Sequence, residues 1–295
     1  MAPAACKDKN HQGDQNMFTS YFKKLDEYGI IPVVKLDSAD SAVPLAKALI
    51  DGRLPIAEVT FRTDAAEESI KRMKEAFPEI LLGAGTVSSP DQVKRAVAAG
   101  AEFIVSPGFN EKVVQYCVDN KIPVLPGCST PSDIEKALSF GLTTVKFFPA
   151  EVMGGLKAIK AMAAPYVNVY FIPTGGINES NLMEYLKFKR IIACGGSWMV
   201  PDNLIRSGKF DEIKGLTEAA VKKSLGLNLG DAGINAEGER QVTLGTRSVE
   251  SARRYFERLG FRFDESTAKK DENGSVQAIR FADKFGGFAV LLKNN

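Results

Sequence analysis

The stretch TTVKFFPAEVMGG, residues 143–155, has the composition of a buried β-strand followed by a turn, yet it contains a lysine. Val145 and Phe147 flank Lys146, and Pro149 ends the run. Because side chains alternate between the two faces of a strand, Val145 and Phe147 share one face and Lys146 lies on the other. Lysine is rarely buried unless it is paired or has a chemical role. The role of Lys146 therefore decides how this chain is interpreted.

Similar short apolar runs recur from residue 30 to about residue 200 and alternate with segments of helical periodicity. Two of these segments, SPDQ at 89–92 and TPSD at 130–133, place a proline just after a capping residue, as helix starts do. Such alternation indicates parallel βα units. Eight strands favour a closed (β/α)8 TIM barrel over an open doubly wound sheet, and no GxGxxG motif opens the first unit. The predicted strands are Ile30–Leu36, Ile56–Phe61, Ile80–Gly83, Phe103–Ser106, Pro123–Pro126, Thr144–Phe148, Val169–Pro173 and Ile191–Cys194, and the predicted helices include 41–51, 64–77, 90–99, 111–120 and 131–140.

The two ends of the chain differ from this repeating region. Residues 1–16 are polar and are predicted to form a disordered extension. Residues 225–241 are rich in glycine and asparagine, which predicts a linker or an interrupted strand. Residues 242–295 then indicate a strand, a helix at 248–259 and two more strands. We expect a barrel over residues 17–224 and a small α+β appendage after it.

Composition argues against several classes of function. The 295 residues carry 38 basic and 36 acidic side chains, so neither the net charge of +2 nor any basic cluster indicates nucleic-acid binding. The apolar runs are too short to cross a bilayer, so we expect no membrane partner. A single histidine, His11, gives no basis for a histidine-ligated metal, and we expect neither metal nor cofactor. The cysteines lack disulfide spacing, which favours reduced thiols in the cytoplasm; they are Cys6, Cys117, Cys128 and Cys194.

A second strand repeats the arrangement found around Lys146. In IAEVTFRT, residues 56–63, Glu58, Thr60 and Arg62 share the face that we expect to point into the barrel. Burial disfavours the charged form of an amine, so a buried lysine is nucleophilic and can form a Schiff base with a carbonyl substrate. Glu58 can transfer protons in such a reaction. The alternative is a structural ion pair, and spacing alone does not decide between the two.

Two glycine pairs follow the last two predicted strands, in PTGGI at 173–177 and CGGSWMV at 194–200. Barrels of this class often bind phosphate at these positions through backbone N–H groups. Ser197 adds a hydroxyl to the second pair. The alternative is that the glycines only serve tight turns.

Other strand ends carry weaker signals. Thr86 in GAGTV could bind a carboxylate, although capping of the next helix is the simpler interpretation. Pro107 in SPG shapes a loop or contacts a ligand. Trp198 is predicted to pack in the core. Cys128 has no base nearby in the sequence and is predicted to be an inert thiol.

Six motifs, in this order and spacing, resemble the bacterial 2-keto-3-deoxy-6-phosphogluconate (KDPG) aldolases, also called bifunctional 4-hydroxy-2-oxoglutarate/KDPG aldolases. The motifs are EVTFRT, GAGTV, SPG, KFFPAE, PTGGI and GGSWMV. The resemblance covers about residues 17–224. It implies a class I aldolase on a (β/α)8 barrel, a homotrimer that uses no cofactor and cleaves KDPG to pyruvate and glyceraldehyde 3-phosphate.

The resemblance also implies a role for each candidate site residue. Lys146 would be the Schiff-base lysine and Glu58 the general acid/base. The remaining residues would contact the phosphorylated 2-keto acid: Arg62 and Thr86 at its carboxylate, Pro107 and Phe148 as pocket walls, Gly175, Gly176 and Ser197 at its phosphate, and Lys35 as additional charge near the phosphate.

The tail resembles a different family. Residues 248–293 are similar to the second half of a glyoxalase/bleomycin-resistance (vicinal oxygen chelate, VOC) module, and LGDAGIN at 229–235 is similar to its opening strand. Metal ligands in that fold are typically histidine and glutamate. The region contains no histidine, so we expect no metal there.

Three alternatives to KDPG cleavage remain open at this point. One is a phosphosugar isomerase or epimerase in which Glu58 is the base and Lys146 acts only through its charge. Another is a non-catalytic barrel that binds phosphoesters. The third is an aldolase for the 6-phosphogalactonate epimer. Cleavage of 4-hydroxy-2-oxoglutarate to pyruvate and glyoxylate is expected as an additional activity of the aldolase.

Overall fold

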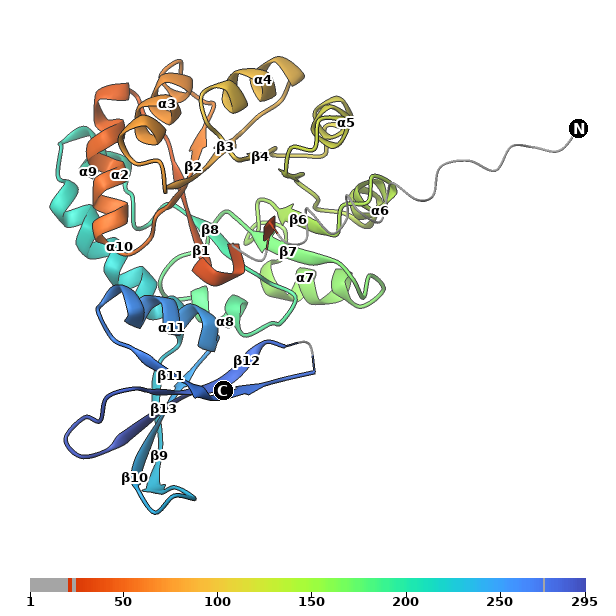
Figure 1. Cartoon of the computed structure of the whole chain (residues 1–295). Helices are drawn as coiled ribbons and strands as arrows, with labels where there is room; N and C mark the ends of the chain where they lie inside the picture. The colour runs from red at the N-terminus through yellow and green to blue at the C-terminus, as the bar shows by residue number, and fades with distance from the viewer. Residues whose placement is uncertain (1–20, 23–24, 273) are drawn as a thin grey trace, which may run out of the picture.

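The computed structural model describes residues 21–22, 25–272 and 274–295. The extension predicted for residues 1–16, with Cys6 and His11, lies outside this part. Within it, strands and helices alternate as far as α10 (Figure 1). The strands are β1 (Ile30–Val34), β2 (Ile56–Thr60), β3 (Leu81–Gly85), β4 (Phe103–Val105), β5 (Val124–Leu125), β6 (Thr144–Phe147), β7 (Tyr170–Pro173) and β8 (Cys194–Gly196). The helices are η1 (Ala39–Ser41), α2 (Ala42–Asp51), α3 (Ala66–Ala76), α4 (Pro90–Ala98), α5 (Glu111–Asp119), α6 (Pro131–Ser139), α7 (Gly155–Ala163), α8 (Leu182–Leu186), α9 (Asp202–Arg206) and α10 (Phe210–Leu225).

Side-chain caps fix the starts of several helices. Ser89 accepts a hydrogen bond from the backbone of Gln92 at the start of α4. Thr130 and Asp133 form a reciprocal capping box at the start of α6. Each cap satisfies backbone N–H groups that the helix itself leaves unpaired. The helix starts predicted from SPDQ and TPSD are therefore confirmed.

The strands pair in parallel and follow one another in sequence order. One sheet has the order β5-β4-β3-β2-β1-β8, and β6 pairs with β7 in a second. Single bridges connect the two sheets at both ends, Gly127 with Lys146 and Thr174 with Gly195. The result is a curled, TIM-barrel-like α/β fold, in which the carboxyl ends of all these strands lie on one rim. Strand β8 begins at Cys194 rather than at the predicted Ile191, because Ile191 makes only an isolated bridge to Phe171.

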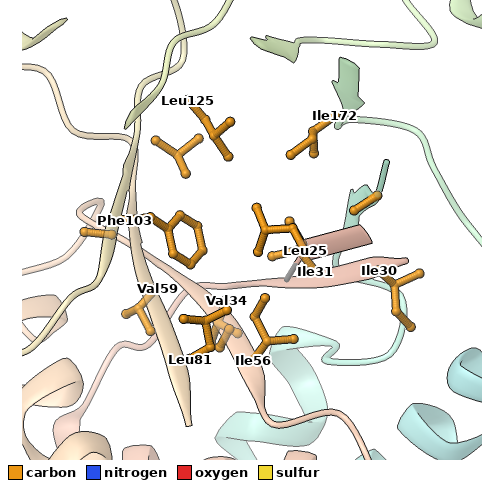
Figure 2. Close-up of a cluster of buried hydrophobic side chains, with 14 of the residues drawn as sticks. Leu25, Ile30, Ile31, Val34, Ile56, Val59, Leu81, Phe103, Leu125 and Ile172 are labelled. Carbon is orange, nitrogen blue, oxygen red and sulfur yellow. The ribbon is translucent and has the colours of Figure 1, made fainter. Parts of the chain in front are cut away.

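Apolar side chains of the strands form the core of this fold. Figure 2 shows side chains from β1, β2, β3, β4, β5 and β7 meeting in one cluster with Leu25. Ile56 and Leu81 belong to this cluster, and the inward positions two residues further along β2 and β3 are Glu58 and Gly83. Along β2, the inward face therefore changes from the apolar Ile56 to the charged Glu58.

The residues after α10 form a separate sheet with one helix. Its elements are β9 (Asn228–Ile234), β10 (Arg240–Thr246), α11 (Val249–Arg258), β11 (Phe263–Lys270), β12 (Val276–Phe281) and β13 (Ala289–Asn294). The strand order is β11-β12-β13-β10-β9; β10 and β13 are parallel and the other pairs antiparallel. We call residues 226–295 the appendage. Residues 225–241, expected as a linker or an interrupted strand, contain β9. The prediction of three strands from residue 242 was wrong by one, because the segment forms four.

Arginine side chains join the appendage to the side of the barrel where the strands begin. Arg247 donates to the backbone oxygens of Ser224 and Asp26 and forms an ion pair with the Asp26 carboxylate at 3.3 Å. Arg254 forms an ion pair with Glu27. Each helix in the described part of the chain is too short or too polar to span a bilayer.

Candidate active site

Lys146 and Glu58 meet inside the barrel although they lie far apart in the sequence. Nζ of Lys146 is 3.2 Å from Oε1 of Glu58, and the two residues are only 6% and 3% exposed. Strand alternation placed both side chains on inward faces, and this prediction is confirmed. A buried amine beside a buried carboxylate can attack a carbonyl and exchange protons with the group that results.

Bare backbone leaves room around this pair. A Cβ added at Gly85 would lie 2.2 Å from Oε1 of Glu58, so any side chain there would displace the carboxylate. A Cβ at Gly195 would lie 2.3 Å from the hydroxyl of Thr174. That hydroxyl is buried and has no hydrogen-bond partner in the structure. No sequence pattern pointed to Thr174 or to Gly85 within GAGTV. Gly195 belongs to the second predicted glycine pair, which forms the end of β8 instead of following this strand.

Phe148 forms part of the mouth of the site. Its ring centroid is 5.2 Å from Nζ of Lys146, a distance typical of a cation–π contact. The ring is 36% exposed, which is unusual for phenylalanine, so one side of it is free to contact a ligand. A Cβ at Gly175 would come within 3.4 Å of this ring. The lysine and the first glycine of PTGGI therefore both border Phe148.

The loop after β7 is held by the segment after β6. Gly175 and Gly176 have φ angles of +97° and +84°, which favour glycine. The N–H of Glu151 donates to the oxygen of Gly175 at 3.1 Å, and a Cβ at Gly176 would lie 2.5 Å from Cγ of Glu151. The buried hydroxyl of Tyr185 donates to the Glu151 carboxylate. Glu151 and Tyr185 therefore brace this loop, and no motif in the sequence pointed to Tyr185.

The remaining rim residues lie at the expected strand ends. Arg62 follows β2 and donates to the hydroxyl of Thr60 at 3.1 Å. Thr86 follows β3 with a φ of +59°, a left-handed conformation that non-glycine residues seldom adopt and that is often found at functional sites. Ser89 caps α4, so the capping role considered for Thr86 was wrong. Pro107 follows β4 and is exposed, while Ser197 follows β8 and is also exposed.

Lys35 has a partner of its own at the rim. Its ammonium group lies 2.8 Å from Oδ1 of Asp37, and Arg206 contacts Oδ2 of the same carboxylate at 2.8 Å. The hydrogen bonds from Lys35 and Arg206 lower the pKa of Asp37. Lys35 therefore shares one carboxylate with Arg206.

The described cysteines are buried free thiols: Cys117, Cys128 and Cys194. Burial raises the pKa of Cys117 to about 12 and also raises the pKa of Cys128, so both are protonated. Trp198 packs against the core, as predicted. Within residues 21–22, 25–272 and 274–295, no group of three or more His, Cys, Asp or Glu side chains is placed to hold a metal ion.

Comparison with known sequences identifies relatives of the barrel. The family model of the KDPG and KHG aldolases matches residues 22–216. The 2-dehydro-3-deoxy-phosphogluconate aldolase of Treponema pallidum (strain Nichols) is 47% identical over 201 residues, which cover 68% of this chain and 96% of the relative. The KHG/KDPG aldolase of Escherichia coli (strain K12) is 40% identical over 208 residues, covering 70% and 98% of the two chains.

Solved structures agree with these relatives. The KDPG aldolase of Legionella pneumophila, with pyruvate captured at low pH as a covalent carbinolamine intermediate, gives a TM-score of 0.65 at 37% identity. It covers 67% of this chain and 97% of its own. The 2-keto-3-deoxy-6-phosphogluconate aldolase of Zymomonas mobilis ZM4 with 3-phosphoglycerate gives a TM-score of 0.64 at 39% identity. The match covers 68% of this chain and 94% of that enzyme. On these matches, and with the barrel and its motifs in place, the chain belongs to the KDPG and KHG aldolase family.

Proposed function

We propose that this protein is a Schiff-base (class I) aldolase that cleaves KDPG to pyruvate and glyceraldehyde 3-phosphate on a (β/α)8 barrel. The contact between the buried Lys146 and Glu58 carries the proposal, because a class I aldolase needs an amine and a proton-transfer group at one carbonyl. The names of the relatives support it, as does the covalent pyruvate adduct in the Legionella enzyme.

The pair has a defined task in each step. Glu58 takes a proton from the ammonium group of Lys146, and the free amine attacks C2 of the substrate. Glu58 then gives this proton to the carbinolamine hydroxyl, which leaves as water, and a protonated imine results. The imine nitrogen accepts the electron pair of the C3–C4 bond as that bond breaks, while the C4 hydroxyl gives its proton to Glu58. The aldehyde leaves, and Glu58 returns the proton to C3 of the enamine. Water then hydrolyses the imine and releases pyruvate and free Lys146.

The rim residues are proposed to hold the two ends of the substrate. Arg62 and Thr86 would bind the carboxylate, with Pro107 and Phe148 as walls; Gly175, Gly176 and Ser197 would bind the phosphate. The placement of these residues at the strand ends supports this assignment, as does the left-handed backbone of Thr86. Lys35 is proposed to contribute only long-range charge, since Asp37 already pairs with it.

Trapping with borohydride tests the chemistry. Pyruvate and sodium borohydride should add one reduced pyruvyl group to wild-type protein, at Lys146 alone. Lys146→Arg should take up none and should release no pyruvate, because a guanidinium stays protonated. If the protein were an isomerase or epimerase, it would convert a phosphosugar but would form no pyruvyl adduct. A non-catalytic binding barrel would form no adduct and would turn over no substrate. An adduct at Lys35, or an equal adduct in Lys146→Arg, would refute the assignment.

A second activity, cleavage of 4-hydroxy-2-oxoglutarate, is proposed from the KHG/KDPG name of the Escherichia coli relative. A lactate dehydrogenase assay for released pyruvate, run with KDPG, its galactonate epimer and 4-hydroxy-2-oxoglutarate, ranks the three substrates. KDPG should give the highest kcat/KM. A preference for the galactonate epimer would change the substrate but not the imine chemistry.

We also propose how the chain is divided and assembled. Residues 17–224 would be the catalytic barrel and residues 242–295 a VOC-like segment, an idea supported by the order β10-α11-β11-β12-β13 with β10 parallel to β13. A cytoplasmic location fits the free thiols. A homotrimer is proposed from the family resemblance, and the exposed apolar side chains of Val152 and Met153 are candidates for burial between subunits. Light scattering at several protein concentrations tests the trimer.

A further inference from the structure

A cleft of about 850 Å³ lies where the barrel meets the appendage. The ends of α8 and α10 form its barrel side, and Arg247 and Ser248 stand on the appendage side. Figure 1 shows α8, α10 and the appendage together at one end of the barrel. Asp26 precedes β1 and Ile191 precedes β8, so the cleft is at the beginnings of the strands. The Lys146–Glu58 pair lies towards the opposite rim, which makes the cleft distinct from the catalytic pocket.

The side chains that line this cleft carry an excess of positive charge. Its only ionisable side chains among the described residues are five basic ones and the carboxylate of Asp26, which already pairs with Arg247. The four others are lysines that make no ion pair within the described part of the chain; they are Lys187, Lys189, Lys222 and Lys223. Lysines elsewhere do find carboxylates, for example Lys47, Lys74 and Lys209. Four unneutralised ammonium groups around one concavity attract anions.

The walls indicate which kind of anion fits. The volume of the cleft is within the range of small-molecule sites. Apolar side chains of Met183, Leu186 and Ile191 line the floor beside the lysines. We propose that this cleft binds a small organic phosphate carrying at least two negative charges, with its phosphates among the lysines and its carbon part on the apolar floor.

Some of these lysines could stabilise a helix end without binding a ligand. Lys222 and Lys223 lie in the last turn of α10, where a positive charge offsets the negative end of the helix dipole. That role needs no ligand, and it does not explain Lys189, which lies beyond α8 and lines the same cleft. Lys136 occupies the equivalent last-turn position in α6, away from the cleft, and provides a matched control.

Calorimetric titration of the full chain with inorganic pyrophosphate tests the proposal. Lys187→Glu/Lys222→Glu should weaken binding at the cleft by at least about tenfold, because two attractions become repulsions. Lys136→Glu/Lys157→Glu changes the net charge by the same amount on other helices and should leave the affinity within about twofold. Lys187→Gln/Lys222→Gln repeats the test without charge reversal if the first variant does not fold.

Hydrogen exchange locates the binding and separates it from the catalytic pocket. Pyrophosphate should slow exchange in residues 222–228 and 246–250, and this protection should disappear in the cleft variant only. Equal loss of binding in the cleft and control variants would show a nonspecific charge effect and overturn the proposal. The proposal would also be overturned if the cleft variant bound pyrophosphate with unchanged affinity or if the wild-type protein did not bind it. Protection confined to the loops after β7 and β8 would overturn the proposal too.

Discussion

Gly85→Ala tests whether bare backbone beside Glu58 is what keeps the Lys146–Glu58 pair in place. The added Cβ would sit 2.2 Å from Oε1, whereas ordinary contact begins at 3.4 Å, so the carboxylate must move by the difference of 1.2 Å. The φ of Gly85 is not in the left-handed region, so the backbone itself accepts alanine. A displacement of about 1 Å in a catalytic group can cost roughly 100-fold in rate, and we expect kcat for KDPG to fall by about that factor.

The assay is pyruvate release coupled to lactate dehydrogenase, with borohydride trapping in parallel. The lysine is untouched, so Gly85→Ala should still form the pyruvyl adduct at Lys146. Gly215→Ala is the matched control: its Cβ would meet nothing within 4 Å on α10, and it should leave kcat unchanged while stabilising the helix by about 0.5–1 kcal/mol. Wild-type kcat in a folded Gly85→Ala protein would refute the idea that Glu58 needs this space.

Three further perturbations address other parts of the molecule. Glu58→Gln should lower turnover by about 10²–10⁴-fold in the pyruvate assay, and near-normal turnover would move the acid/base role to another group. Tyr185→Phe removes the hydroxyl that holds Glu151 and should raise KM for KDPG more than for 4-hydroxy-2-oxoglutarate; equal increases would argue against a brace for the phosphate loop. Arg247→Ala should lower the free energy of unfolding of the appendage by about 1.5–3 kcal/mol while kcat stays constant, measured by thermal melting beside the activity assay.

The barrel could be predicted because its pattern is local. Each βα unit shows an apolar run, a turn and a helix start in consecutive residues, and the caps at Ser89 and Thr130 confirm how those starts form. The appendage was harder, since its sheet mixes charged and apolar residues in the same strands. β11 has the sequence FDESTAKK, with no buried position, so composition gave little sign of it.

The contact between Lys146 and Glu58 could be predicted from the sequence, because side-chain alternation along two strands put both residues on inward faces. The residues that hold the site loops in place could not be predicted, because they act through contacts between residues far apart in the sequence. Glu151 beneath Gly176 is one example: a Cβ at Gly176 would strike this side chain, so Gly176→Ala would disturb the protein itself and cannot report on phosphate binding alone. The ion pair of Lys35 with Asp37, two residues away, could have been anticipated from the sequence PVVKLDS.

The position of β13 in the appendage sheet has a consequence for biosynthesis. This strand lies between β12 and β10, yet it is made after every other strand of the sheet. While residues 289–294 are still inside the ribosome, β10 and β12 each lack a neighbour and the two halves of the sheet cannot join. The barrel strands have all emerged by then, and domains generally fold as units during synthesis. On a ribosome stalled just before β13, the barrel should therefore be folded and resistant to protease. The appendage, which follows α10, should still be unfolded.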